Sequence, residues 1–261
     1  MTVFLHEIRS NKIALLIWSA VISFMLGVCV IIYPEMSSQM GNISEMMSQM
    51  GSFSDAFGMD QLNFGEFMGY FGIECGNVLG LGGAMFAAIL GASMLSKEEN
   101  GHTAEFLLTH PLSRARIMTE KLFAAFAQVC IMNVAVIAIT TACILAINVD
   151  ADAATLALMF LAYFILQIEI VAITFGLSAI MKKGALGAGL GLVFGLYFAN
   201  ILANLTEELE FLNFITPFGY AAAANIIPDK SLNLGYIAVG MGLAALGIAF
   251  AYFKYTKKDI S

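Results

Sequence analysis

The segment SKEENGHTAEFLLTHPLSRARIMTEK, residues 96–121, is a charged stretch between two apolar ones. It carries four of the chain's twelve Lys and Arg residues, whereas the flanking runs at residues 76–95 and 122–147 contain no charged side chain. An uncharged run of about 20 residues is long enough to cross a bilayer as a helix. The segment therefore predicts a polar connection between two membrane helices.

Four further long apolar runs occur, and the composition of the whole chain agrees with them. The 261 residues are 60% hydrophobic and 12% charged, whereas soluble domains are about 25% charged. We predict an all-α integral membrane protein that forms a single transmembrane domain over residues 1–261. Its six expected spans are residues 13–33, 76–95, 122–147, 155–181, 185–205 and 234–253.

The Lys and Arg residues fall almost entirely on one side of these spans. Eleven of the twelve lie before the first span, after the second, after the fourth or after the sixth, and only Lys230 lies on the other side. Cytoplasmic loops of membrane proteins are enriched in Lys and Arg, so we expect both termini and residues 96–121 in the cytoplasm. Within that segment, Arg114, Arg116 and Lys121 are expected at the level of the lipid headgroups.

Sequence motifs for catalysis are absent from the chain. It has no G-x-x-x-x-G-K-[ST] phosphate loop, no G-x-S-x-G and no H-E-x-x-H. The four Cys residues and three His residues show no metal-ligand spacing. We therefore expect no enzyme active site, no metal site and no cofactor on this chain, and no nucleic-acid partner.

Glycine spacing in the fifth span predicts a face for close helix packing. Gly187, Gly191 and Gly195 repeat every four residues, the pattern that lets membrane helices approach closely. This face could pack within the subunit or form an interface between two copies. The sequence does not decide between them.

Glu169 is an acidic residue in the middle of the fourth span. A charge at this depth is costly, so such a residue is a candidate for function. Ala162, Ala172 and Gly176 share its side of the helix and predict close packing against another helix. Glu169 could have a structural role, or it could line a path for a substrate or an ion.

Helix signals divide the segment 96–121 into two pieces. Thr103 can cap a short helix that ends before Pro111, and Ser113 can cap a second helix that continues into the third span. The short helix carries an apolar patch at residues 106–108 and is too short to be stable alone. Either lipid or a cytoplasmic protein should cover that patch.

Thr216, Pro217 and Pro228 similarly predict small outer helices before the sixth span. The apolar outer connection at residues 41–73 could form an interfacial helix.

The run from Glu99 to Arg114 resembles the cytoplasmic loop of type-2 ATP-binding-cassette (ABC-2) transporter permeases. In that family the loop carries a coupling helix that touches an ATPase subunit. This chain departs from the family pattern by placing His102 between Gly101 and Thr103. The resemblance implies ATPase-coupling roles for Glu99, Gly101, Thr103, Glu105, Phe106, Leu107, Leu108, Pro111 and Arg114.

The resemblance also implies a function and partners. The chain would be the membrane subunit of an ATP-driven ABC exporter in a prokaryotic plasma membrane. ATP and Mg²⁺ would bind to a separate ATPase, in two copies per complex, and the permease would pair with a second copy or a sister permease. The substrate would be a peptide, an antibiotic, a lipid or another amphipathic compound.

Three other functions fit the same apolar chain. A membrane sensor or immunity module would bind a peptide or lipid without transporting it. A secondary transporter would couple transport to protons through Glu169. A membrane-embedded enzyme fits least well, because paired polar groups on facing spans are lacking.

Overall fold

The structure is a computed structural model that describes residues 2–37, 62–63, 65–100, 113–181 and 184–257. Within these ranges the chain forms helices and their connections, without a strand. The helices are α1 (Thr2–Ser10), α2 (Lys12–Ser37), α5 (Phe67–Cys75), the π-helix η2 (Gly76–Leu81), α6 (Gly82–Asn100), α8 (Arg114–Ile147), α9 (Ala153–Ile180), α10 (Ala185–Leu205), the 3-10 helix η3 (Glu207–Phe214), α11 (Pro217–Ala221), α12 (Ala223–Asp229) and α13 (Leu234–Lys257).

Six helical stretches among the described residues are long and apolar enough to cross a membrane, as the sequence predicts. They are Lys12–Ser37, Phe67–Lys97, Arg114–Ile147, Ala153–Ile180, Ala185–Leu205 and Leu234–Lys257. The second stretch begins at Phe67 rather than at Gly76, because α5, η2 and α6 follow one another without a break. Residues 67–73 of the outer connection therefore extend a span, whereas residues 41–61 lie outside the described residues.

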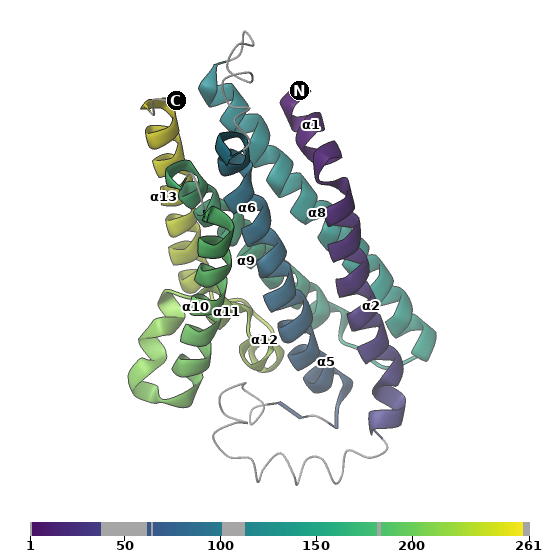
Figure 1. Ribbon diagram of the computed structural model, residues 1–261. Helices are drawn as coiled ribbons and strands as arrows, with labels where there is room; N and C mark the ends of the chain where they lie inside the picture. Colours follow the sequence, from purple (N-terminus) through teal and green to yellow (C-terminus); the bar gives the residue numbers. More distant parts are fainter. Residues whose placement is uncertain (1, 38–61, 64, 101–112, 182–183, 258–261) are drawn as a thin grey trace.

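The first turn of α1, the end of α6, the start of α8 and the end of α13 lie at one end of the bundle (Figure 1). We call this the terminal end. The other end, which we call the far end, holds α5, η3 and α12 (Figure 1). Helix α9 packs between α6 and α13, while α2 packs on α8 and α10 packs on α6. Helix α1 is an additional short helix that was not predicted from the sequence.

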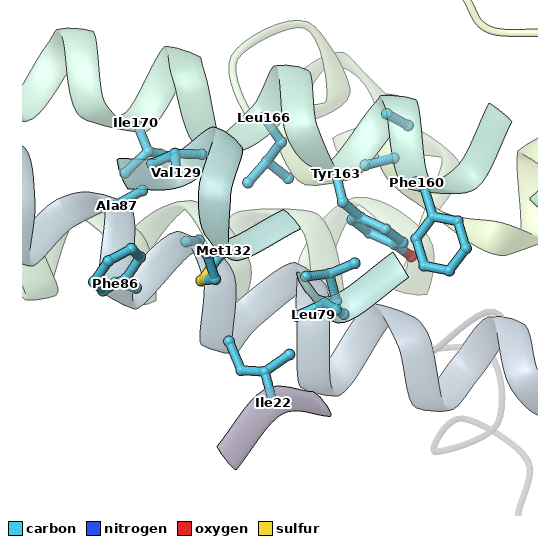
Figure 2. Close-up of a cluster of buried hydrophobic side chains, with 14 of the residues drawn as sticks. Ile22, Leu79, Phe86, Ala87, Val129, Met132, Phe160, Tyr163, Leu166 and Ile170 are labelled. Atoms are coloured by element: carbon cyan, nitrogen blue, oxygen red, sulfur yellow. The ribbon is translucent and has the colours of Figure 1, made fainter. Parts of the chain in front are cut away.

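The core lies where α2, η2, α6, α8 and α9 meet. Figure 2 shows Ile22, Leu79, Phe86, Met132 and Tyr163 among its side chains, all of them buried. Large apolar side chains such as Phe24 on α2, Leu145 on α8 and Leu246 on α13 are exposed instead. Exposed apolar surface of this extent is what a lipid environment accommodates.

Small residues bring α9 and α13 into close contact. A Cβ atom added to Gly176 would lie 2.8 Å from the Gly247 carbonyl oxygen, and one added to Gly247 would lie 2.9 Å from the Ala172 carbonyl oxygen. The predicted packing of this side of α9 against another helix is therefore confirmed, with α13 as the partner.

Candidate functional site

The predicted coupling segment is flanked by the last turn of α6 and the first turn of α8. Ser113 caps α8, as predicted, and its hydroxyl accepts a hydrogen bond from the Arg116 backbone N–H at 3.3 Å. Arg114, the first residue of α8, donates from Nη1 to the Tyr255 carbonyl oxygen of α13 at 3.4 Å. Glu99 belongs to the last turn of α6. The remaining predicted coupling residues lie outside the described residues: Gly101, Thr103, Glu105, Phe106, Leu107, Leu108 and Pro111.

A buried ion cluster, formed by Glu7, Lys97 and Lys121, joins α1 to both helices that flank this segment. The Lys121 ammonium donates to Glu7 Oε1 at 2.7 Å and to the Met94 carbonyl oxygen at 2.8 Å. Lys97 forms the second ion pair with Glu7. Glu7 is 1% exposed and Lys121 is 0% exposed. The cluster thus holds α1, α6 and α8 together at the terminal end.

The charges within the cluster determine the ionisation of Glu7. Burial alone would raise the pKa of Glu7, but the positive charges of Lys121 and Lys97 outweigh it and lower the pKa below its ordinary value. Helix α1 is held by a second acid, because Glu120 Oε2 accepts hydrogen bonds from the backbone N–H groups of Val3 at 3.1 Å and Phe4 at 3.3 Å. These contacts fix the N-terminal helix against α8.

The position of Lys121 corrects the sequence prediction. We expected its ammonium group among lipid headgroups, but Lys121 is completely buried. Inside the bundle its ammonium group donates hydrogen bonds to Glu7 and to the Met94 carbonyl oxygen, which compensate for the loss of water. The role of Glu7 was not predicted, because the residues around a single acid in a short N-terminal stretch do not indicate its distant partners. The only available hint was Lys121 directly beside an uncharged run.

Glu169 lies in the middle of α9 and is 0% exposed. Among the described residues, neither of its carboxyl oxygens has a hydrogen-bond partner. Gly240 of α13 faces the carboxyl group so closely that an added Cβ atom would lie 2.5 Å from Oε1. The Tyr220 hydroxyl of α11 is likewise buried and has no hydrogen-bond partner among the described residues.

A buried polar network two residues before Glu169 connects three spans. Asn133 of α8 donates from Nδ2 to Gln167 Oε1 at 2.6 Å, and Gln167 donates from Nε2 to the Leu79 carbonyl oxygen at 3.3 Å. Leu79 belongs to the π-helix η2, and π-helices within longer helices often occur at functional sites. Neither η2 nor this network was predicted from the sequence.

Two cavities open at the far end of the bundle. One of about 110 Å³ lies between η2, α9, α10 and the short helices, and Asn77, Tyr163 and Tyr197 contribute polar groups to it. The other, of about 280 Å³, lies between η3, α11, α12 and the start of α13. Tyr220 lines the second cavity. The predicted small helices are present here, and Thr216 caps α11 with Pro217 in its first turn.

The glycine face of α10 remains open. A Cβ atom added to Gly187, Gly191 or Gly195 would meet no atom within 4 Å. Gly189 instead packs against α6, where an added Cβ atom would lie 3.0 Å from the Ala92 Cβ atom. The three predicted packing glycines thus have no neighbour at that distance in the described part of the subunit.

Comparison with known families gives one match. The sequence profile of a family described as "ABC-2 family transporter protein" matches residues 1–260. A search of curated proteins gives no significant match. The match spans both buried carboxyl groups, all six apolar stretches and the predicted coupling segment.

Proposed function

Because the chain belongs to the ABC-2 family of transporter proteins, we propose that it is the permease subunit of an ATP-driven exporter. ATP and Mg²⁺ bind to a separate ATPase, and hydrolysis there drives substrate outward through the permease. The family match over residues 1–260 carries this proposal. The six apolar stretches make the chain a multi-pass membrane protein, and we place it in a prokaryotic plasma membrane with the terminal end in the cytoplasm.

We assign the coupling contact to residues 99–114. This segment connects α6 to α8, and the ion cluster ties the adjoining parts of both helices to Glu7. A force applied by an ATPase to the segment would therefore move α6, α8 and α1 together. The π-helix η2 directly precedes α6 in the same apolar stretch, and Gln167 of α9 donates to the Leu79 carbonyl oxygen of η2. This interruption provides a place where the stretch can deform.

The working complex contains two ATPase subunits and two permeases, which are copies or sister chains, in a lipid bilayer. The open glycine face of α10 supports pairing, because it offers a close-packing surface that the described subunit leaves unused. We propose that α10 forms part of the interface between the permeases.

The substrate path passes Glu169. Its carboxyl group is buried and unpartnered in the described chain, and intramembrane acids of this kind mark substrate or ion pathways. Export of a peptide, antibiotic, lipid or other amphipathic compound fits this environment. The same observation supports a second candidate, in which protons moving through Glu169 drive transport, and that function would persist without ATP. A sensor without transport would show ligand-stimulated ATPase activity but no translocation.

Co-purification tests the proposed coupling. We expect a C-terminally tagged chain to bring down an ABC ATPase from its native membrane, and Leu107→Asp/Leu108→Asp to abolish this recovery. Phe211→Asp is the control, because it adds an acid to an exposed apolar position of η3 at the far end. Failure to recover an ATPase with wild type in several mild detergents, or equal losses in the two variants at normal membrane levels, would refute the assignment.

A further inference from the structure

The cavity of about 110 Å³ at the far end has an uncharged lining among the described residues. It lies between α5, η2, α9, α10 and the short helices α11 and α12. Asparagine and tyrosine side chains supply its polar groups, while Ile73, Ile201 and Phe218 supply apolar surface. Because burying an ion without a counter-charge is costly, this lining favours an uncharged ligand with polar and apolar parts.

Tyr163 of α9 directs its hydroxyl group into this cavity. A Cβ atom added to Gly80 would lie 3.0 Å from the ring atom Cε1 of Tyr163, whereas one added to Gly76 would lie 3.2 Å from the hydroxyl oxygen. The ring therefore extends along η2 from Gly80 toward Gly76. Of these two glycines, only Gly76 lines the cavity, so the hydroxyl is the part of Tyr163 that reaches it.

The Tyr163 hydroxyl is free to bind a ligand. Tyr163 is only 2% exposed, yet its hydroxyl forms no hydrogen bond with any described residue. It also keeps accessible surface, unlike the Tyr220 hydroxyl, which is completely enclosed. A buried hydroxyl without a partner is costly unless a bound molecule supplies the hydrogen bond.

A second free polar atom comes from Asn200 of α10, which is also buried and lines the cavity. Its Nδ2 donates to Asn213 Oδ1 at 3.2 Å, and its Oδ1 accepts no hydrogen bond from the described chain. Tyr197 of the same helix already donates to Asn77 Oδ1 of η2 at 3.1 Å. The cavity therefore offers a free hydroxyl on α9 and a free acceptor on α10.

A secondary amide matches these two groups. Its carbonyl oxygen accepts and its N–H donates, and the two point in opposite directions in a trans amide. An ester of the same shape lacks the donor. The cavity of about 110 Å³ has room for roughly five non-hydrogen atoms, since one of about 150 Å³ accommodates benzene. A peptide group with its two flanking carbon atoms has this size.

We propose that this cavity binds a peptide amide group of the exported molecule. The Tyr163 hydroxyl donates to the amide carbonyl oxygen, Asn200 Oδ1 accepts from the amide N–H, and Ile201 and Phe218 contact the flanking carbon atoms. The proposal rests on the proposed export function and narrows its substrates to peptides.

Fluorine NMR of the full chain in phosphatidylcholine nanodiscs tests the proposal at the site itself. The reporter is 3-fluorotyrosine at position 163, the probe is N-methylacetamide, and methyl acetate is its isosteric ester. We expect a saturable shift with the amide and at least about threefold weaker binding of the ester, which lacks one hydrogen bond. Acetate and methylammonium ions should give no saturable shift. The same reporter at position 236, which lines the other cavity, should not respond to the amide.

Variants without the reporter are compared by ligand-detected NMR. Tyr163→Phe should weaken amide binding about threefold to tenfold through loss of one hydrogen bond, and Gly76→Ala should also weaken it by crowding the hydroxyl. Tyr220→Phe is the matched control, because it removes a buried, unpartnered hydroxyl that does not line this cavity. It should leave amide binding within about twofold of wild type.

Three results would overturn the proposal. They are the absence of a saturable amide shift at position 163, binding of methyl acetate or 2-butanol as tight as that of the amide, and equal losses in Tyr163→Phe and Tyr220→Phe. None of these measurements needs an ATPase. Failure of the coupling assignment would therefore appear separately, as a chain that binds the amide but recovers no ATPase.

Discussion

Two buried carboxyl groups, Glu7 and Glu169, have opposite surroundings in this protein. Glu7 at the terminal end receives two lysine ammonium groups, and one of these also donates to the Met94 carbonyl oxygen. Glu169 in mid-bundle has no hydrogen-bond partner among the described residues and faces a glycine of α13. Both side chains are at most 1% exposed, so burial does not distinguish them.

This difference indicates two uses of a buried acid. The two lysine ammonium groups compensate the charge of the Glu7 carboxylate, so that Glu7 connects α1 to α6 and α8. Removing one partner would leave a buried charge only partly compensated. Glu169 makes no equivalent contribution to holding helices together. Its environment is consistent with a carboxyl group that gains a hydrogen-bond or charge partner only when a substrate or a proton binds.

The largest expected effect on stability is at the ion cluster of Glu7, Lys97 and Lys121. Lys121→Met removes one ion pair and the hydrogen bond to Met94, and it leaves Glu7 dependent on Lys97 alone. We expect a loss of about 3–5 kcal/mol in the free energy of unfolding, as for other broken buried pairs. Thermal unfolding in detergent measures it. Glu7→Gln/Lys121→Met should recover part of the loss, and a double variant less stable than Lys121→Met would contradict the role assigned to the pair.

A smaller loss is expected at the contact between α9 and α13. Gly247→Ala would place a Cβ atom 2.9 Å from the Ala172 carbonyl oxygen and 3.1 Å from the Ile173 Cα atom. Because these are backbone atoms, the helices must separate, at a cost of about 1–3 kcal/mol. Gly242→Ala on the same helix meets nothing within 4 Å and should leave the unfolding temperature unchanged. Equal shifts for both variants would disprove the steric explanation.

A still smaller effect on stability, but a large effect on activity, is expected at Glu169. Glu169→Gln preserves the shape of the side chain, and neither carboxyl oxygen of Glu169 has a hydrogen-bond partner among the described residues. We expect its free energy of unfolding to change by less than about 1 kcal/mol, while ligand-stimulated ATPase activity and transport by the reconstituted complex decrease. Wild-type activity at wild-type expression would show that Glu169 does not lie on the pathway.

The smallest effect is expected at an exposed ion pair. The hydrogen bond from Lys230 lowers the pKa of Asp152 to about 2, with further hydrogen bonds from Thr155 and Ala154. The carboxylate form is therefore favoured, and its contribution to stability is present above the ordinary pKa of 3.8 and is lost as pH falls toward 2. Lys230→Met should raise the pKa of Asp152 toward 3.8 in an NMR titration. An unchanged pKa would mean that the pair does not form in solution.

The apolar runs and helix caps could be predicted from sequence because they depend on neighbouring residues. Ser113 and Thr216 cap their helices as their position before a helical run indicates. The side of α9 with Ala172 and Gly176 likewise follows from helical periodicity, and it packs against another helix as predicted; the structure identifies Gly247 of α13 as the neighbour. These features need only local spacing along one helix.

The partners of charged groups could not be predicted, because they depend on which helices meet. The pair formed by Glu7 and Lys121 spans 114 positions in sequence, and nothing near either residue indicates the other. The π-helix η2 and its contact with Gln167 also depend on packing between distant spans. The open glycine face of α10 is a related case, since spacing alone could not tell an interface within the subunit from one between subunits.

Site-specific photocrosslinking in native membranes tests the central claim most directly, namely that residues 99–114 contact an ATPase. A photoreactive amino acid would replace Leu107 in one variant and Phe211, at the far end, in another. We predict an adduct between position 107 and an ABC ATPase, identified by mass spectrometry, and none at position 211. Absence of an ATPase adduct at position 107 in a normally accumulated protein, or an equal yield at position 211, would contradict the account.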